Sequence, residues 1–436
     1  MGKGRQLFQY LQMAAEAHAR WEIETSNEIL RNRKKLLILL ALCLPIVAVI
    51  GVSWAAGDLL GGKEAYAPAF YSTSIFLITI VIGLMAGLIT GCIGAGGGFI
   101  ITPALMSAGV KGILAVGTDL FHIFAKAIMG TAVHKKLGNV SVKLAITFLV
   151  GSTVGVVIGG GINRAIYDYN PVMSDFFISM VYVVLLGFLG IYSMTDFLKL
   201  RRAGKETKIT STSAKAAPAA ASGTTGLAQK LQSIHIPPMI SFDEDLVPGG
   251  NRIAAIFVVA CGFVVGTVAA IMGVGGGFLA FPMFVYMLGV SSFTTVGTDI
   301  LQIIFTAGFA AISQYAIYGF IFYTLAMGML LGSLFGIQVG ALTTKVVKGI
   351  YIRGFYAITI LAGFINRLFA LPKKLNAMGY INIPKGLADG IDFAGLIIFF
   401  LIIGAFGVWV FSMFFKNINV LRGKAAPMEG VGGGAH

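Results

Sequence analysis

Long apolar runs alternate with short polar stretches along most of the chain. Several runs reach the length of roughly 20 residues that spans a bilayer as a helix. Lipid solvates such helices, so they need no water-facing surface. The pattern predicts an all-α polytopic membrane protein. Its predicted segments are 36–56, 74–93, 98–110, 112–133, 143–163, 174–196, 252–272, 278–290, 292–317, 321–343, 353–371 and 393–415.

Two of these segments, 98–110 and 278–290, are too short to span a bilayer as straight helices. Each is either a half-helix that crosses or one arm of a re-entrant hairpin. The predicted domains are an amphipathic cytoplasmic segment (1–35), a first transmembrane half (36–198, with a repeat at 74–196), a flexible cytoplasmic linker (199–250), a second half (251–416, with a repeat at 252–371) and a cytoplasmic tail (417–436).

The N-terminal segment has Leu7, Leu11 and Trp21 at helical spacing, which fits a helix on the membrane face or one that contacts a partner. The first apolar run begins only at Leu36, so we expect Leu36–Ala56 to be a retained membrane helix rather than a cleaved signal. The basic residues before it indicate a cytoplasmic N-terminus. In the linker, we expect the Ser/Thr/Ala/Pro-rich stretch to be flexible and Asp243, Glu244 and Asp245 to form a solvated turn.

The two halves contain an internal repeat. Residues 87–103, GLITGCIGAGGGFIITP, match residues 266–282, GTVAAIMGVGGGFLAFP. After small slips in register, GTD at 117–119 matches GTD at 297–299, and the spaced glycines at 151, 155 and 159 match those at 332, 336 and 340. Chance similarity between apolar helices would not keep this register.

Each repeat contains an odd number of predicted segments, so consecutive copies enter the membrane from opposite sides. The loop charges agree, because His134–Lys135–Lys136 in the first copy corresponds to the neutral stretch QYAIYG in the second. Inverted-topology repeats with broken helices are typical of secondary transporters. We therefore predict two inverted repeats with short or broken helices at the glycine motifs, and one extra transmembrane helix at each end.

Composition excludes several alternatives. Hydrophobic residues make up 57% of the chain and charged residues 11%, whereas soluble domains carry about 25% charged residues. The net charge of +14 would suggest nucleic acid in a soluble protein, but here it is explained by cytoplasmic loops. We expect no nucleic-acid partner. Cys43, Cys92 and Cys261 fall in apolar runs and have no metal or disulfide spacing.

The glycine motifs are the first candidate binding site. Glycine permits positive φ and close approach of a ligand, and the N–H groups at the start of the following helix form a positive end. This arrangement suits an oxyanion; the alternative is that the glycines only permit close helix packing. The candidate residues are Gly94, Gly96, Gly97, Gly98 and Phe99 in the first copy and Gly273, Gly275, Gly276, Gly277 and Phe278 in the second.

A polar stripe follows each motif. In the first copy it consists of Thr118, Asp119, His122 and Lys126, and in the second of Thr298, Asp299 and Gln302, with Thr306 in the place of the lysine. Charged residues inside a membrane usually face a cavity or a partner. Lys126 could hold an anion or pair with Asp119 or Asp299, and Asp299 has no obvious local partner.

A separate pair, Asn366 and Arg367, lies toward the end of a predicted crossing. We expect Arg367 to snorkel to the interface, with anion attraction as the alternative.

The motif GxGGGFxxxP, the downstream GTD and the later GxxxGxxxG resemble the TauE/SafE family of sulfite exporters, over roughly 74–196 and 252–371. The resemblance implies a transporter for export, or sometimes uptake, of small sulfur-containing anions such as sulfite, sulfoacetate or related sulfonates, and we expect an exporter. It also implies a bacterial inner membrane location. Asp119 and Asp299 stand where we expect a small polar residue in many members, which leaves proton coupling open.

We expect no enzyme activity, no catalytic or metal-ligating residues and no cofactor beyond a coupling proton or ion. No Gly-x-x-x-x-Gly-Lys-Ser/Thr sequence of an ATPase is present. The alternatives are an intramembrane enzyme, for which no nucleophile or metal spacing is visible, and a membrane scaffold, which would not explain the duplicated glycine motif. The expected partners are the anion and the bilayer, and a homo-oligomer stays open.

Overall fold

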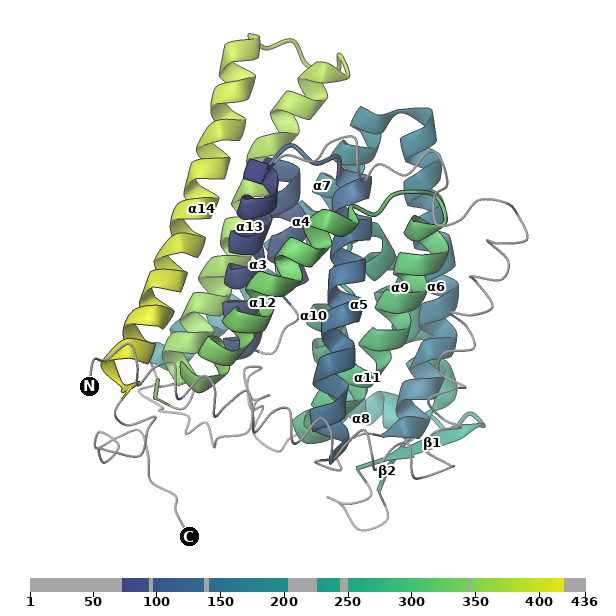
Figure 1. The fold of residues 1–436 in the computed structure, drawn as a ribbon. Helices are drawn as coiled ribbons and strands as arrows, with labels where there is room; N and C mark the ends of the chain where they lie inside the picture. Colours follow the sequence, from purple (N-terminus) through teal and green to yellow (C-terminus); the bar gives the residue numbers. More distant parts are fainter. Residues whose placement is uncertain are drawn as a thin grey trace. The chain divides into compact units, whose positions relative to one another are not determined.

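The computed structural model describes residues 73–93, 97–136, 141–202, 226–243, 250–343, 346–347 and 349–418 (Figure 1). The predictions for the N-terminal segment, for Leu36–Ala56, for Gly94 and Gly96 and for the C-terminal tail lie outside these residues or almost entirely so.

The described chain is mainly helical, as predicted. The first half contains α3 (Thr73–Ile93), α4 (Gly98–Ser107), α5 (Gly112–Lys136), α6 (Val142–Tyr169) and α7 (Pro171–Arg202). The second half contains α9 (Ala255–Met272), α10 (Gly277–Pro282) with the π-helical turn η2 (Met283–Met287), α11 (Ser292–Ala310) with the π-helical turn η3 (Ala311–Ala316), α12 (Tyr323–Thr343), α13 (Gly349–Ala377) and α14 (Lys385–Lys416).

Seven of the described helices are long and apolar enough to cross a membrane. They are α3, α6, α7, α9, α12, α13 and α14. Many of their large apolar side chains remain exposed, for example Phe188 at 70% and Val408 at 72%. Lipid rather than water is the solvent that suits such surfaces, so the chain is a multi-pass membrane protein.

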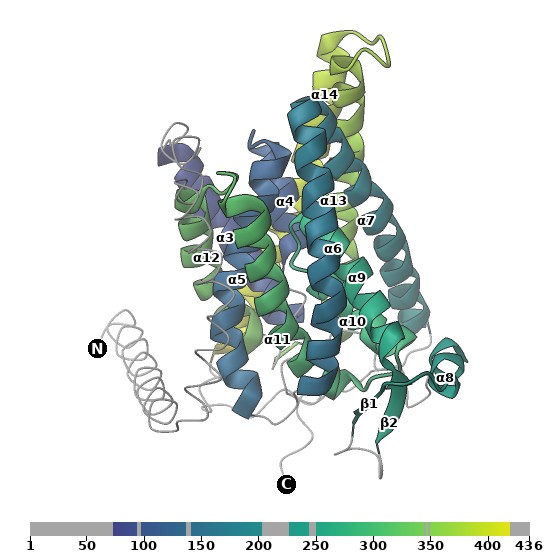
Figure 2. The same cartoon turned by 90° about the vertical axis from the view of Figure 1, so that its right-hand side faces the viewer.

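Helices of the two halves pack against one another through glycines. α3 lies along α12, and α6 lies along α9 (Figures 1 and 2). A Cβ atom built on Gly151 would lie 1.9 Å from the Val259 carbonyl oxygen, and one built on Gly332 would lie 2.0 Å from the Ile80 carbonyl oxygen. Only glycine permits these backbones to approach so closely.

The same glycine contacts recur in both halves. Gly155 faces Phe263 as Gly336 faces Leu84, and the partners in each case are equivalent positions of the sequence repeat. Residue numbers rise together along both pairs, so α3 runs parallel to α12 and α6 runs parallel to α9. The contacts are therefore preserved when the two halves are exchanged.

The equivalent helices α7 and α13 run in opposite directions. Gly187 contacts Phe364, Gly190 contacts Leu361, and Gly354 contacts Phe197. One residue number rises as the other falls, so these two packed helices are antiparallel.

The two ends of the described bundle can be told apart by their contacts. One end, which we call the Tyr169 end, contains the turn between α6 and α7. There the Lys111 ammonium donates to the Tyr167 hydroxyl at 3.4 Å. The hairpin end has the start of α6 and an antiparallel hairpin of β1 (Met239–Phe242) and β2 (Asn251–Ala254). Lys111 and its repeat equivalent Ser291, which is held by the hairpin residue Asp243, thus lie at opposite ends.

The short segments predicted at 98–110 and 278–290 are shorter still as helices. α4 has ten residues and α10 has six before its π-helical turn. The start of α12 lies beside α5 and Tyr167, at the Tyr169 end. Because α3 runs parallel to α12, α3 also begins at that end. Lys111, at the far side of α4, lies at the same end, so α4 returns to the side from which α3 started.

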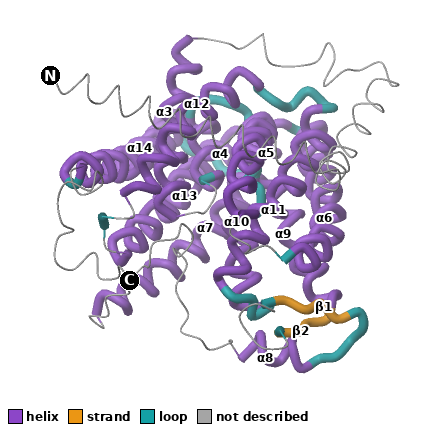
Figure 3. The backbone as a smooth tube through the Cα atoms, turned by 60° about the horizontal axis from the view of Figure 1, so that its bottom comes forward, coloured by secondary structure: helices purple, strands orange, loops and turns teal. Residues whose placement is uncertain are grey.

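Within the predicted linker, residues 226–243 form secondary structure, whereas the Ser/Thr/Ala/Pro-rich stretch expected to be flexible lies almost entirely outside the described residues. α8 (Gly226–Ser233) and the hairpin pack at the hairpin end, as Figures 2 and 3 show. The Gln232 side chain donates to the Leu288 carbonyl oxygen at 2.8 Å. Phe242 lies in an apolar cluster with Leu144, Phe148 and Phe284. Burial of these apolar side chains against the bundle holds this part of the segment in place.

The prediction that Asp243 lies in a solvated turn is wrong. Its side chain is 6% exposed. One carboxylate oxygen accepts the Ser291 backbone N–H at 2.8 Å, and the other accepts the hydroxyls of Ser291 and Thr294. A carboxylate is stabilised at a helix N-terminus because it satisfies N–H groups that have no partner within the helix. Asp243 therefore anchors the start of α11.

Candidate functional site

Both glycine motifs break their helices, as predicted. Gly97 has φ +70° and precedes α4, and Gly276 has φ +88° and precedes α10. Gly273 and Gly275 also have positive φ, at +81° and +66°. A residue with a Cβ atom is strained in this left-handed conformation, so glycine is needed for the chain to turn between the two helices.

The two breaks lie against each other in the protein interior. The Phe99 and Phe278 rings, at equivalent positions, have centroids 6.4 Å apart. A Cβ atom on Gly98 would lie 3.0 Å from the Val274 Cα atom, so the start of α4 touches the second break directly. Gly97, Gly98, Phe99, Gly273, Gly275, Gly276, Gly277 and Phe278 are all buried.

At the second break, polar side chains donate hydrogen bonds to the carbonyl oxygens at the C-terminal end of α9. The last carbonyl groups of a helix have no intrahelical partner. Here the Tyr182 hydroxyl donates to the Met272 carbonyl oxygen at 2.6 Å, and the Tyr315 hydroxyl donates to that of Ala270. The Asn163 amide donates to the Ile271 carbonyl oxygen at 3.4 Å and to the Tyr315 hydroxyl at 3.0 Å. The break is thus stabilised by residues from α6, α7 and η3.

Asp119 and His122 form a buried polar cluster in the middle of α5, and both side chains are fully buried. One Asp119 carboxylate oxygen, Oδ2, accepts the Thr102 hydroxyl at 3.0 Å. His122 Nε2 lies 2.7 Å from the Ser333 hydroxyl, and His122 Nδ1 lies 3.7 Å from Asp119 Oδ1. The cluster joins α4, α5 and α12 and therefore connects the two halves.

Lys126 lies one helical turn beyond His122 and points toward the first break. It is 8% exposed, and its ammonium group donates to the Thr90 hydroxyl at 3.3 Å. The same hydroxyl oxygen would lie 2.8 Å from a Cβ atom on Gly97. An ammonium group and the N-terminus of α4 therefore approach each other, and both favour negative charge. The pairing of Lys126 with Asp119 or Asp299 stays a prediction.

The second copy has a different cluster around Asp299. The Gln302 amide donates to Asp299 Oδ1 at 2.7 Å, so the expectation that Asp299 lacks a local partner is wrong. Thr306 donates to Gln302 at 2.9 Å and lies 3.1 Å from the Ser152 hydroxyl. A Cβ atom on Gly277 would lie 3.3 Å from Asp299 Oδ2. A carboxylate thus already lies at the start of α10, whereas the first break has a lysine.

Thr118 and Thr298 have equivalent structural bonds. The Phe322 backbone N–H donates to the Thr118 hydroxyl at 2.9 Å, and the Ser141 backbone N–H donates to the Thr298 hydroxyl at 3.0 Å. Each threonine therefore holds the start of the fourth helix of the opposite repeat, α12 or α6. This bond uses one acceptor position of each hydroxyl, and a substrate role for either residue stays a prediction.

Arg367 does not snorkel to the interface. It is 2% exposed, and its guanidinium donates to the Ser107 hydroxyl at 2.6 Å and to the Pro103 carbonyl oxygen at 3.2 Å. It also donates to the Asn366 side chain at 2.8 Å. The apolar context of α13 suggested an interfacial arginine, but the partners lie on α4, more than two hundred residues away in sequence. Arg367 therefore fixes the C-terminal half of α4.

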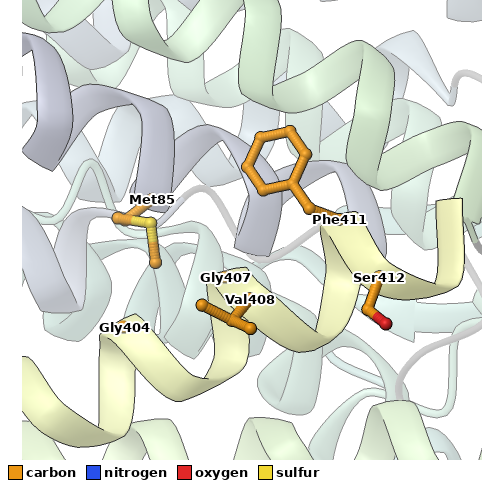
Figure 4. A pocket seen from close by; sticks show the side chains of 6 residues that line it. All are labelled: Met85, Gly404, Gly407, Val408, Phe411 and Ser412. Carbon is orange, nitrogen blue, oxygen red and sulfur yellow. The ribbon is translucent and has the colours of Figure 1, made fainter. Parts of the chain in front are cut away.

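An apolar hollow of about 460 Å³ lies between α3 and α14 (Figure 4). It is lined by Met85, Gly404, Gly407, Val408, Phe411 and Ser412. Apart from the Ser412 hydroxyl, these side chains offer no polar group to an anion. The hollow is therefore not the candidate anion site.

Several polar residues of the breaks were not among the predicted site residues. These are Thr90, Thr102, Ser152, Asn163, Tyr182, Tyr315 and Ser333. The repeat contained a usable signal for two of them, because Ser152 and Ser333 directly follow the matched glycines Gly151 and Gly332. Thr90 and Tyr182 carry no such signal, since their bonding partners, Lys126 and Met272, lie on other helices.

Comparison with known proteins gives a family match. The family model described as sulfite exporter TauE/SafE matches residues 79–367. The chain is 26% identical over 275 residues to the "Probable membrane transporter protein YunE" of Bacillus subtilis, covering 61% of this chain and 87% of that protein. It is 24% identical over 270 residues to a "Probable membrane transporter protein" of Xylella fastidiosa, covering 61% of this chain and 84% of that protein.

A shorter stretch resembles a plant protein. Over 81 residues the chain is 36% identical to "Sulfite exporter TauE/SafE family protein 6" of Arabidopsis thaliana, which covers 18% of this chain and 19% of that protein. No solved structure gives a significant match.

Proposed function

The chain belongs to the sulfite exporter TauE/SafE family of membrane transporters, and we propose that it is a secondary transporter of small sulfur-containing anions. The substrates we propose are sulfite, sulfoacetate or related sulfonates, and the direction we propose is export. The proposal rests mainly on one observation: two glycine breaks at equivalent positions meet in the interior beside a buried lysine.

The anion site in this proposal is at the first break. The Thr90 hydroxyl donates its proton to the Ala86 carbonyl oxygen at 2.8 Å and accepts from Lys126, so it positions the lysine. Two features favour an oxyanion there: the Lys126 ammonium and the N-terminal end of α4 after Gly97. An oxyanion accepts hydrogen bonds only, and each of these groups can donate one. Asp299 disfavours an anion at the start of α10 by charge repulsion. We therefore assign the anion to the first break and a positioning role to the second.

Alternating access is the mechanism we propose. In many secondary transporters it takes place between two repeats that are related by an axis in the membrane plane. The exchange-symmetric glycine contacts, the antiparallel run of α7 against α13 and the opposite locations of Lys111 and Ser291 all support such an inverted relation. The paired helices α3–α12 and α6–α9 would then rock against each other around the breaks.

The membrane we propose is the inner membrane of a bacterium, with the hairpin end in the cytoplasm. Lys199, Arg201 and Arg202 at the end of α7 support this orientation. At the Tyr169 end, the basic residues are offset by acidic ones: Lys373 lies 3.0 Å from Asp389 and 3.3 Å from Asp392. A net positive charge would thus remain on the cytoplasmic side.

The test is anion flux into proteoliposomes containing the full chain, with sulfite, sulfate, thiosulfate, sulfoacetate and chloride compared in parallel. Lys126→Gln should lower flux of the transported anion about tenfold or more, because a hydrogen bond to a charged group contributes about 1.5–3 kcal/mol. Lys199→Gln, an exposed position at the hairpin end, is the matched control and should keep its flux.

Equal flux in Lys126→Gln and the wild type would contradict the assignment of Lys126 to the anion. Absence of flux for every anion in the panel, with the protein correctly folded, would instead favour a membrane scaffold.

A further inference from the structure

We propose that Asp119 and His122 together hold one exchangeable proton, which makes them the proton-binding site of this protein. The geometry points to this pair because two buried acceptor atoms face each other. Asp119 Oδ1 and His122 Nδ1 are 3.7 Å apart, and neither has a hydrogen-bond partner within the part of the chain that the structure describes.

The hydrogen bonds around His122 define where its first proton lies. The Ser333 hydroxyl donates its only proton to the Gly83 carbonyl oxygen at 3.1 Å. This bond favours Ser333 as the acceptor from His122 Nε2, which lies 2.7 Å away. A neutral imidazole has one N–H and one acceptor nitrogen. With the proton on Nε2, Nδ1 presents a lone pair to Asp119.

An ionised Asp119 makes this arrangement unfavourable. Its Oδ2 atom already accepts the Thr102 hydroxyl at 3.0 Å, while Oδ1 points its lone pairs at those of His122 Nδ1. Buried acceptors that lack a donor cost free energy. One additional proton, on the carboxyl group or on the imidazole, gives the facing acceptor a donor once the two atoms move from 3.7 Å to a hydrogen-bond distance of about 2.7–3.2 Å.

Other ionisable groups surround the pair. Lys126 lies on the same helix, one turn further on, and Tyr182 approaches from α7. Asp299 lies on α11, which packs against α5, and Arg367 approaches Tyr182 from α13. Lys126 favours the ionised carboxylate, so it opposes proton binding, and the buried surroundings oppose an isolated charge. These opposing effects suit a proton that is released and rebound rather than one held permanently.

The second repeat lacks this property because of one substitution in its own sequence. Gln302 occupies the position equivalent to His122, and its amide donates to Asp299 Oδ1 at 2.7 Å. Asp299 therefore needs no added proton to satisfy that oxygen. The comparison isolates His122 as the residue that turns a repeated carboxylate into a proton site.

The role of the proton rests on the proposed transport function. Asp119 and His122 connect α5 with α4 and α12, the helices that belong to opposite repeats. Lys126, assigned above to the anion, is one turn away. A proton gained or lost by the pair changes the charge next to the anion, so the movement of the anion becomes coupled to a pH gradient.

Infrared difference spectroscopy on the purified full-length protein tests the proton site without any substrate. Between acidic and alkaline buffers, the wild type should show a transition of the buried pair, seen as a protonated-carboxyl band if the proton is on Asp119 or as imidazole ring bands if it is on His122. Asp119→Asn should lose that transition. His122→Gln, which copies the second repeat, should lose it too, because the glutamine can donate to Asp119. Asp299→Asn, the matched variant in the other repeat, should keep it.

Three outcomes would overturn the proposal. The first is a wild type without the transition, as expected if Ser333 donated to His122 and the imidazole proton lay on Nδ1. The second is a transition that survives in Asp119→Asn and in His122→Gln and that Asp299→Asn does not remove either. The third is a transition that follows sodium concentration rather than pH when sodium is exchanged for choline.

A flux measurement then tests the coupling. With a pH gradient imposed on proteoliposomes, wild-type anion flux should change with the size of the gradient, and the residual flux of His122→Gln should not. Wild-type flux that ignores the gradient would refute the coupling. Absence of all anion flux, with the infrared transition intact, would refute the proposed transport function and leave the proton site standing.

Discussion

At the residue scale, buried polar side chains hold the short helix α4 in place. Arg367 is the largest of them and binds the Pro103 carbonyl oxygen and the Ser107 hydroxyl. A short helix of ten residues with an internal proline is only marginally stable by itself. Contacts from α13 therefore determine where its N-terminal end, at the first break, is directed.

Replacement of Arg367 should be costly. Arg367→Met removes the side-chain donor to the Pro103 carbonyl oxygen and one of the donors to the Ser107 and Asn366 side chains, which still bond each other. A buried group left unsatisfied costs about 1–3 kcal/mol. We expect a clear drop in the unfolding temperature of the detergent-purified protein. The unfolding temperature of Arg367→Lys should lie between those of the wild type and of Arg367→Met, since lysine keeps the charge but loses the planar guanidinium group. The exposed Arg201→Met is the matched control, and an equal loss in both variants would contradict the specific role of Arg367.

Sequence reasoning at this scale identified which residues are unusual but not what they touch. Asp119, His122 and Lys126 were singled out because they interrupt an apolar segment, and the structure does bury them. The partners of Arg367 and His122 come from helices on the other side of the repeat boundary, so nothing near them in sequence reveals the bond. The sequence predicts no local partner for Asp299 although Gln302 lies three residues away, because the side-chain rotamer decides that contact.

At the element scale, the glycine contacts predict that equivalent glycines in the two halves contribute equally to stability. Gly151→Ala and Gly332→Ala place a methyl group against a backbone carbonyl oxygen of the facing helix, at 1.9 and 2.0 Å before relaxation. We expect both variants to lose about 1–3 kcal/mol of stability from overpacking. Equal losses in the two halves would reflect the equivalence of the α6–α9 and α3–α12 pairs, and thermal unfolding in detergent measures them.

A nearby glycine serves as the control for this prediction. Gly161 lies in the same helix as Gly151, and a Cβ atom built on it would meet nothing within 4 Å. Gly161→Ala should therefore raise stability by about 1 kcal/mol, as expected from helix propensity alone. A destabilising Gly161→Ala, or a harmless Gly151→Ala, would show that packing against the facing helix is not what requires glycine.

Most helices were predictable because membrane crossings leave a long apolar signal, as for α3 and α9, whose bounds differ from the predicted segments by at most a few residues. The β1–β2 hairpin was missed because four-residue strands are too short to show a period. Asp243 was misjudged for a related reason. Its neighbours are polar, and only the fold shows that it reaches the start of α11.

At the scale of the whole molecule, the direction in which each helix crosses the bundle bears on the proposed mechanism. Consecutive helices and their contacts assign Lys111, Tyr169 and Tyr380 to one end, since the start of α7 meets the end of α13 where Lys374 lies 3.8 Å from Asp175. Lys199 and the hairpin belong to the other end. The sequence repeat suggested this arrangement through an odd number of segments, but the direction of a half-helix such as α4 could not be read from its length.

Cysteine labelling tests the arrangement in intact cells. In a background with the native cysteines replaced by serine, single cysteines at Tyr169 and Tyr380, which are 82% and 68% exposed, should react with a membrane-impermeant maleimide added from outside. Single cysteines at Lys199 and Ile236 should react only after the membrane is opened, because we assign the hairpin end to the cytoplasm. Labelling of Tyr169 and Lys199 from the same side would contradict a full crossing by α7, and with it the inverted relation between the repeats from which we propose alternating access.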